Sequence, residues 1–209
     1  PDKLPWEEHN IDFVIDSTGA FRTRELLQKQ LDRGAKRILI TAPVKGDDQT
    51  VVMGLNQEDY DPEKHYMLSN ASFTTNCLAP MAKALNDCHP IISGLMCTIH
   101  GYTGDQMTLD GPQRKGDKRR SRAAAENIVP NSTGAAKAIG LVIPELKGKL
   151  TGTSMRIPSA DVSIVDLTCR LEKAATYDEI CAAVKAAAEG PMAGVVEYVD
   201  DEVVSSDSI

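Results

Sequence analysis

A strand, a glycine turn, a helix and a second strand follow one another within about the first forty residues, and this order constrains the fold most. The first strand is predicted over 11–16, and leucines at helical spacing over 26–31 predict the helix, with Gly34 at its C′ position. Residues 37–41 are typical of a second, buried strand. Such βαβ units have parallel strands and a right-handed crossover, so we predict part of a doubly wound α/β sheet.

Small polar residues lie where a ligand of such a sheet would bind. Ligands of doubly wound sheets bind at the carboxyl ends of the strands. Ser17 and Thr18 follow the first predicted strand, and Thr41 ends the second. We therefore expect these residues near a ligand.

The second half of the chain indicates a different, α+β plan. An amphipathic helix is predicted from Asn76 onward, with Pro80 in its first turns, and an apolar strand over 91–100. The Gly-rich, charged segment 104–122 predicts a long loop, and 131–134 the start of another helix. The remaining predictions are strands over 154–158 and 162–171, the latter half-buried and antiparallel, a helix over 177–188, and a strand over 194–199.

Charge and cysteine content argue against several classes of function. With 23 Lys and Arg against 30 Asp and Glu, the net charge of -7 gives no global positive field for nucleic acid or an anionic membrane. Five cysteines without a C-x-x-C pair argue against a disulfide framework and a zinc site, and fit a reducing cytoplasm. No stretch approaches the roughly 18 apolar residues of a membrane span, so a soluble chain is expected.

Three segments place small hydroxyl residues at strand ends or helix starts, namely 72–76, 98–103 and 132–134. Helix N-termini expose unpaired N–H groups, so two such starts together can bind phosphate, although simple capping explains either one alone. His100 is compatible with a core histidine satisfied by a backbone carbonyl and with a general base at a strand end. Spacing does not choose between these roles.

The segment Ser69-Asn70-Ala71-Ser72-Phe73-Thr74-Thr75-Asn76-Cys77-Leu78-Ala79-Pro80 resembles the active-site segment of glyceraldehyde-3-phosphate dehydrogenases, where a catalytic cysteine follows Ala-Ser. The runs 131–138, 143–150 and 165–168 also resemble this family, and 100–106 resembles the bacterial form of its histidine segment. The resemblance runs in order along essentially the whole chain. It implies part of an NAD-binding domain over 1–72 and a catalytic domain over 73–209, as a fragment cut at both ends.

The resemblance also implies a role for individual residues. His100 would be the base that activates the thiol and later exchanges a proton with the substrate oxygen. Attacking inorganic phosphate would be bound by Ser72, Thr74, Thr133 and Gly134. The phosphate of glyceraldehyde 3-phosphate would be held by Thr103 and Arg156, and NAD by Thr18, Gly19 and Thr41. The basic run 115–122, otherwise a solvated loop, would lie between subunits of a cytoplasmic homotetramer.

Phe73 stands where this family has its nucleophilic cysteine, and phenylalanine has no atom that can attack an aldehyde. Cys77 is four residues on, about 5–6 Å away along a helix face. A misplacement of even ~1 Å costs about a hundredfold in rate, so we do not expect Cys77 to substitute.

Two further segments that the family uses are missing from this sequence, namely a Gly-rich phosphate turn before Pro1 and a C-terminal asparagine for the nicotinamide. Weak cofactor binding and no turnover are therefore expected. Two alternatives stay open: a non-catalytic homologue that binds anions or forms oligomers, and an ordinary enzyme in which Phe73 is engineered or erroneous.

Overall fold

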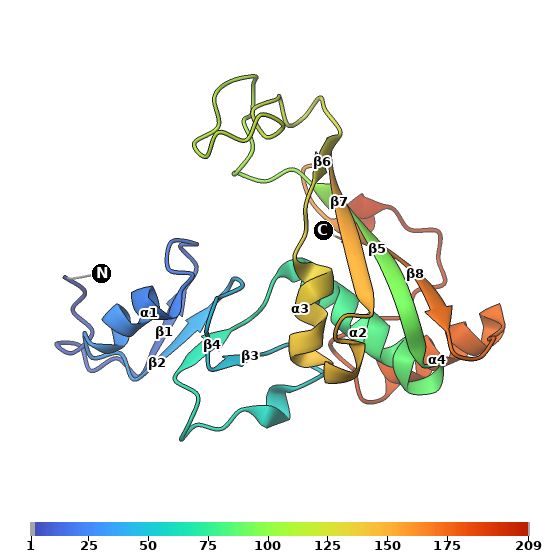
Figure 1. Ribbon diagram of the computed structural model, residues 1–209, viewed down its shortest axis with the longest axis horizontal. Helices are drawn as coiled ribbons and strands as arrows, with labels where there is room; N and C mark the ends of the chain where they lie inside the picture. The colour runs from blue at the N-terminus through green and yellow to red at the C-terminus, as the bar shows by residue number, and fades with distance from the viewer. Residues whose placement is uncertain (1–2, 209) are drawn as a thin grey trace.

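The computed structural model describes residues 3–208, which form two four-stranded sheets with helices α2 and α3 between them (Figure 1). The first sheet has the order β1-β2-β4-β3, and all of its strand pairs are parallel. Its strands are β1 (Phe13–Asp16), β2 (Arg37–Ile40), β3 (Gln49–Thr50) and β4 (Met67–Ser69). Helix α1 (Arg24–Leu31) connects β1 to β2, which confirms the predicted parallel βαβ unit.

Gly34 lies one position later than predicted. Helix α1 ends at Leu31 with Asp32 as its C-cap, so Gly34 lies at C″ and not at C′. Its φ of +98° is left-handed, and a Cβ there would lie 2.7 Å from backbone atoms of Glu7. Both the turn and the close approach of the N-terminal segment therefore require glycine.

The second sheet has the order β6-β7-β5-β8. Its strands are β5 (Ile91–Gly101), β6 (Val129–Asn131), β7 (Leu150–Ile157) and β8 (Ser163–Leu171). Strands β5 and β7 are parallel and the other two pairs antiparallel, which confirms the predicted mostly antiparallel sheet. The sequence did not predict β6, because it is short and contains Pro130, a residue that an edge strand tolerates.

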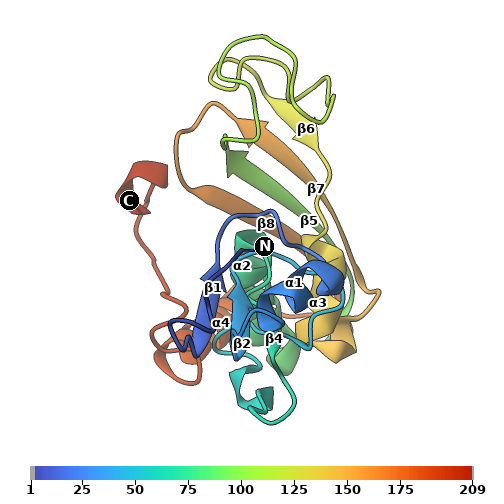
Figure 2. The ribbon, with the colours of Figure 1, turned by 90° about the vertical axis from the view of Figure 1, so that its left-hand side faces the viewer.

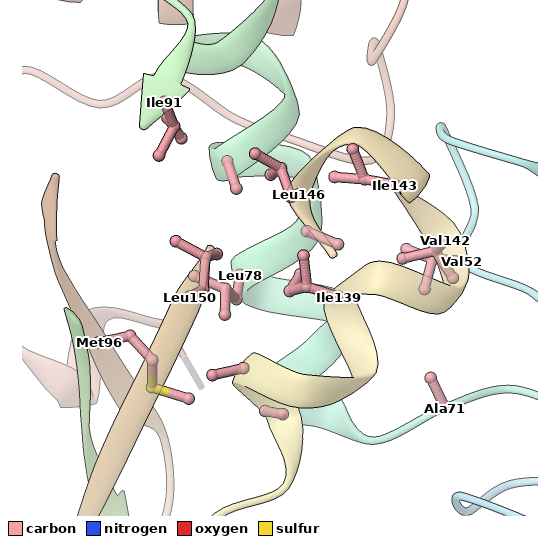
Figure 3. Close-up of a cluster of buried hydrophobic side chains, with 14 residues drawn as sticks. Val52, Ala71, Leu78, Ile91, Met96, Ile139, Val142, Ile143, Leu146 and Leu150 are labelled. Atoms are coloured by element: carbon pink, nitrogen blue, oxygen red, sulfur yellow. The ribbon is translucent and has the colours of Figure 1, made fainter. Parts of the chain in front are cut away.

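Helices α2 (Phe73–Cys88) and α3 (Ala135–Val142) cover one face of the second sheet and form the larger hydrophobic core with it (Figure 3). Leu78 of α2, Ile139 of α3 and Met96 of β5 are fully buried there. Val52 and Ala71 also join this cluster, so the core connects the two halves of the chain. Helix α4 (Tyr177–Glu189) packs on α2, and short 3-10 turns lie at Gln57–Asp59, Pro144–Leu146 and Ser205–Ser208.

Helix α2 begins earlier than predicted and continues through Pro80. The predicted start was Asn76, whereas Ser72 is the N-cap and its Oγ accepts the Thr75 N–H at 3.0 Å. Pro80 consequently lies in the helix interior, where its missing N–H removes one i→i−4 bond. The packing of its two chain neighbours, Ala79 and Met81, in the larger core helps to offset the lost hydrogen bond.

The final strand predicted over 194–199 is wrong. Val195 and Val196 donate their N–H groups to the Met192 carbonyl in a turn, and the segment joins neither sheet. A strand needs a hydrogen-bonded partner, which apolar composition alone does not supply. In β8, the face that begins at Ile164 is the exposed one, and Val162, predicted as its first residue, lies just outside the strand.

The segment 104–122 contains neither helix nor strand, as predicted, and projects beyond β6 in both views (Figure 2). Side chains order it: Gln113 Oε1 accepts the Lys115 N–H at 2.7 Å, and Asp117 accepts the N–H groups of Arg119 and Arg120. Among residues 3–208, no helix is long and apolar enough to cross a membrane.

Candidate active site

A cleft of about 590 Å³ lies where the carboxyl ends of the first sheet face the N-termini of α2 and α3. Most of the site residues predicted from the sequence line it, namely Gly19, Thr41, Ser72, Phe73, Thr74, His100, Thr103, Thr133, Gly134 and Arg156. Thr18 is not among the lining residues. Its hydroxyl instead donates to the Asp16 carboxylate at 2.7 Å, and thereby orders the turn that carries Gly19.

One wall of the cleft consists of small hydroxyl side chains at two helix starts. Ser72 caps α2, and the buried Ala71 before it has a left-handed φ of +56° that turns the chain from β4 into the helix. Thr133 Oγ1 accepts the Ala135 N–H of α3 at 3.2 Å. Ser72 is therefore the N-cap of α2, whereas Thr133 directly precedes Gly134, the N-cap of α3. Both hydroxyl residues also line the cleft beside N–H groups that favour an anion.

Arginines form the adjoining wall. Arg156, at the end of β7, donates to Thr103 Oγ1 at 2.9 Å and to the Gly101 carbonyl at 3.2 Å. Burial lowers the pKa of Arg156, and the charge of Arg120 lowers it further, but Asp105 opposes the shift. An arginine nevertheless stays charged, so this guanidinium is a partly desolvated cation at the cleft.

The long loop contributes residues that the sequence interpretation missed. Arg120 forms a 2.7 Å ion pair with Asp105 and donates to Asn131 Oδ1 at 2.9 Å. The sequence favours a solvated or subunit-facing loop for the basic run 115–122, and in the structure Lys115 and Arg120 of this run line the cleft. Arg22 and Arg156 line the cleft as well, whereas Asp105 is the one carboxylate among the described lining residues. The cleft is therefore locally positive, although the chain as a whole is acidic. No spacing in the sequence signals this, because the loop has no period.

His100 lies at the end of β5 and is only 8% exposed. Its Nδ1 is 2.6 Å from the Gly101 carbonyl, which can only accept, so Nδ1 carries the proton. The Arg156 guanidinium, 3.4 Å from Nδ1, therefore cannot donate to that atom. Nε2 is the unprotonated nitrogen, buried and without a hydrogen-bond partner. Desolvation, aided by the charge of Arg156, lowers the pKa of His100, although the Gly101 hydrogen bond opposes this.

Phe73 is the first residue of α2 and packs against His100. The two ring centroids are 4.7 Å apart in an edge-to-face arrangement, yet the Phe73 side chain remains 64% exposed. Both rings also line a second cavity of about 400 Å³, which Cys77 lines too. Cys77 does not line the main cleft; its side chain is exposed, and partial desolvation by its neighbours raises the pKa of its thiol. Cys77 is therefore displaced from the cleft and mostly protonated near neutral pH.

This arrangement can bind an anion and hold a neutral imidazole with Nε2 free to accept a proton. Among the described residues that line the cleft, none carries a thiol. The site thus combines a locally positive, hydroxyl-lined cleft with an imidazole nitrogen that can accept a proton, and no cysteine is among the described residues that line the cleft.

Comparison with known proteins agrees with this geometry. Residues 72–209 match the family described as "Glyceraldehyde 3-phosphate dehydrogenase, C-terminal domain". Over 207 residues, 99% of this chain, it is 53% identical to a glyceraldehyde-3-phosphate dehydrogenase of Geobacillus stearothermophilus and 56% identical to one of Ogataea parapolymorpha. It is also 54% identical, over its full length, to a cytosolic form from Scenedesmus vacuolatus.

The chain spans 61% of the length of the first two relatives and 66% of the third. The family match covers the helix α2 start, the His100 strand and the Thr133 helix start, which are the elements that build the cleft. The chain belongs to the glyceraldehyde-3-phosphate dehydrogenase family.

Proposed function

We propose that the whole protein oxidises glyceraldehyde 3-phosphate to 1,3-bisphosphoglycerate with NAD and inorganic phosphate, as a cytoplasmic glycolytic homotetramer. The observation that supports this most is the convergence of Ser72, Thr74, Thr133, His100 and Arg156 in one locally positive cleft. Relatives that carry the name of this enzyme are 53% to 56% identical to the chain over its length.

Two anion sites would bind the two phosphates. The hydroxyl wall, with Ser72, Thr74, Thr133 and Gly134, would bind inorganic phosphate, because two helix starts meet there. Thr103 and Arg156 would hold the phosphate of the substrate, since a guanidinium can form two parallel hydrogen bonds to phosphate. The Thr103 hydroxyl donates to the Asp105 carboxylate, which is paired with Arg120, and accepts a hydrogen bond from Arg156. These contacts would keep Arg156 in place.

The carboxyl ends of β1 and β2 fit a dinucleotide. Gly19, with a left-handed φ of +68°, and Thr41 both face the cleft there, and Thr18 orders the turn. A backbone turn without a side chain lets a ligand approach closely. NAD, when bound, accepts the hydride of the reaction. The division into an NAD-binding part over 1–72 and a catalytic part over 73–209 belongs to this proposal.

Phe73 occupies the position of the nucleophile in this proposal, so the chain with Phe73 would not catalyse the oxidation of the aldehyde. His100 would otherwise take the proton of the thiol at Nε2, the nitrogen that has no partner here. A second candidate function is therefore a non-catalytic homologue that binds phosphorylated ligands. The same observation favours it, because the anion-binding walls are complete while no thiol lines the cleft.

The test measures NADH formation at saturating glyceraldehyde 3-phosphate, NAD and phosphate, in a full-length context with Phe73 and with Phe73→Cys. We expect the cysteine variant to be faster by at least about 10³-fold, since losing a nucleophile costs enzymes that much or more. Turnover of the Phe73 protein within about tenfold of the cysteine variant would contradict the proposed role of residue 73. A Cys77→Ala variant of each protein then shows whether that thiol is responsible.

A further inference from the structure

The turn that joins β7 to β8 contains a strained residue close to His100. Val162 has a φ of +65°. This left-handed conformation is a true outlier for a β-branched side chain, and it persists only where surrounding contacts impose it. Val162 precedes β8, in which Ser163 pairs with His100 of β5.

Hydrogen bonds within the turn compensate for this strain. Asp161 Oδ1 accepts the Val162 N–H at 2.7 Å, and the Ser159 hydroxyl donates to the Asp161 carbonyl at 2.9 Å. The turn then presents two carbonyls to the end of β5. The Val162 carbonyl accepts the Gly101 N–H at 3.2 Å, and the Ser159 carbonyl accepts the Tyr102 N–H at 3.0 Å.

These bonds control the acceptor of the His100 proton. The Tyr102 N–H and the Gly101 carbonyl belong to one planar peptide unit and point in opposite directions. Holding the N–H on Ser159 therefore aims the Gly101 oxygen away from the turn, where His100 Nδ1 lies 2.6 Å from it. Arg156 donates to the same oxygen at 3.2 Å, so the histidine and the arginine share one positioned acceptor.

We infer that the turn Ser159–Val162 positions His100, because its Val162 and Ser159 carbonyls hold the Gly101 and Tyr102 N–H groups and so fix the Gly101 carbonyl that keeps the imidazole proton on Nδ1. Asp161 and Val162 are positioning residues in this account and touch no substrate. The inference deepens the proposed role of His100 as a base, since a fixed proton on Nδ1 leaves Nε2 as the accepting nitrogen. It does not depend on whether Phe73 blocks catalysis.

The test is the tautomer of neutral His100, read from its ring-nitrogen NMR shifts well above its pKa. The unaltered chain is expected to show mainly the Nδ1–H form. Asp161→Ala removes the acceptor that supports Val162, so we expect Val162 to leave the left-handed region and the Nδ1–H form to lose its majority. The double variant Asp161→Ala/Val162→Gly should restore that form, since glycine adopts a positive φ without the aspartate.

Asp166→Ala is the matched control, because Asp166 is exposed on β8 and should leave the tautomer unchanged. An unchanged tautomer in Asp161→Ala, or no restoration in the double variant, overturns the inference. If Asp161→Ala does not fold, amide exchange of Tyr102 in the unaltered chain decides. Exchange as slow as that of the β5 amides supports a Tyr102 N–H held by the Ser159 carbonyl, and fast exchange overturns the inference. Because these readouts need no catalysis, they separate this inference from the proposed activity, which Phe73→Cys tests.

Discussion

Two walls of the same cleft differ in how many segments build them. The wall that we propose to bind anions takes side chains from several segments, namely the starts of α2 and α3, the end of β7 and the long loop. The other wall is formed by Phe73 and His100. Attack on an aldehyde would need a nucleophilic atom at position 73, and phenylalanine has none. In the proposed function, binding would thus be distributed over many groups whereas bond formation would rest on one, so a single substitution would remove bond formation and leave binding.

The largest effect on the anion-binding wall is expected for Arg156→Ala. A charge-assisted hydrogen bond contributes about 1.5–3 kcal/mol, so the loss of even one such bond from the guanidinium should lower the affinity for a phosphate monoester at least about 10- to 150-fold. Calorimetric titration with glycerol 3-phosphate measures this.

Arg170→Ala serves as the control for Arg156→Ala, because Arg170 is exposed on β8 and does not line the cleft. It removes the same charge from the chain. Equal losses of affinity in the two variants would mean that net charge alone, and not the cleft, attracts the anion.

For the wall formed by Phe73 and His100, we expect the substitution Phe73→Cys to change the pKa of His100. Phe73→Cys places a thiolate beside the imidazole and removes an apolar ring, and both changes favour the imidazolium. We therefore expect the pKa of His100, which burial lowers in the Phe73 protein, to be higher in the cysteine variant. NMR titration of the imidazole protons measures both values. A pKa in the Phe73 protein that equals or exceeds the other would show that residues 73 and 100 are not neighbours.

A smaller effect is expected for Thr133→Val. The neutral hydroxyl contributes about 0.5–1.5 kcal/mol as one of several hydrogen-bond donors, so the affinity for inorganic phosphate should fall about 2- to 13-fold. The same substitution removes the acceptor of the Ala135 N–H, so thermal unfolding is measured alongside to confirm a folded sample. Thr151→Val, on an exposed position of β7, is the control. Unchanged phosphate affinity in Thr133→Val would refute the hydroxyl wall as the phosphate site.

Local patterns predicted most elements of the fold. The parallel pair β1 and β2 and strand β5 lie where short apolar runs indicate strands, and helix α4 lies where a helix is predicted. The failures share a cause. The segment 194–199 has the composition of a strand but no partner, and β6 has a partner but the composition of a turn. Strand formation is decided by pairing, which the local sequence does not record.

For the site, the sequence by itself determined the chemical types: hydroxyls at two helix starts, a histidine at a strand end, an arginine, and phenylalanine at position 73. Only the tertiary structure decided which of them meet. It brought Arg120 and Lys115 of the aperiodic loop into the cleft, left Thr18 out of it, and placed Cys77 on the second cavity. It also gave the two ring nitrogens of His100 different surroundings, since Nδ1 contacts a backbone carbonyl and Nε2 has no hydrogen-bond partner among the described residues. Residue identity specifies what a side chain can do, whereas its partners depend on contacts between segments distant in the chain, which no local pattern encodes.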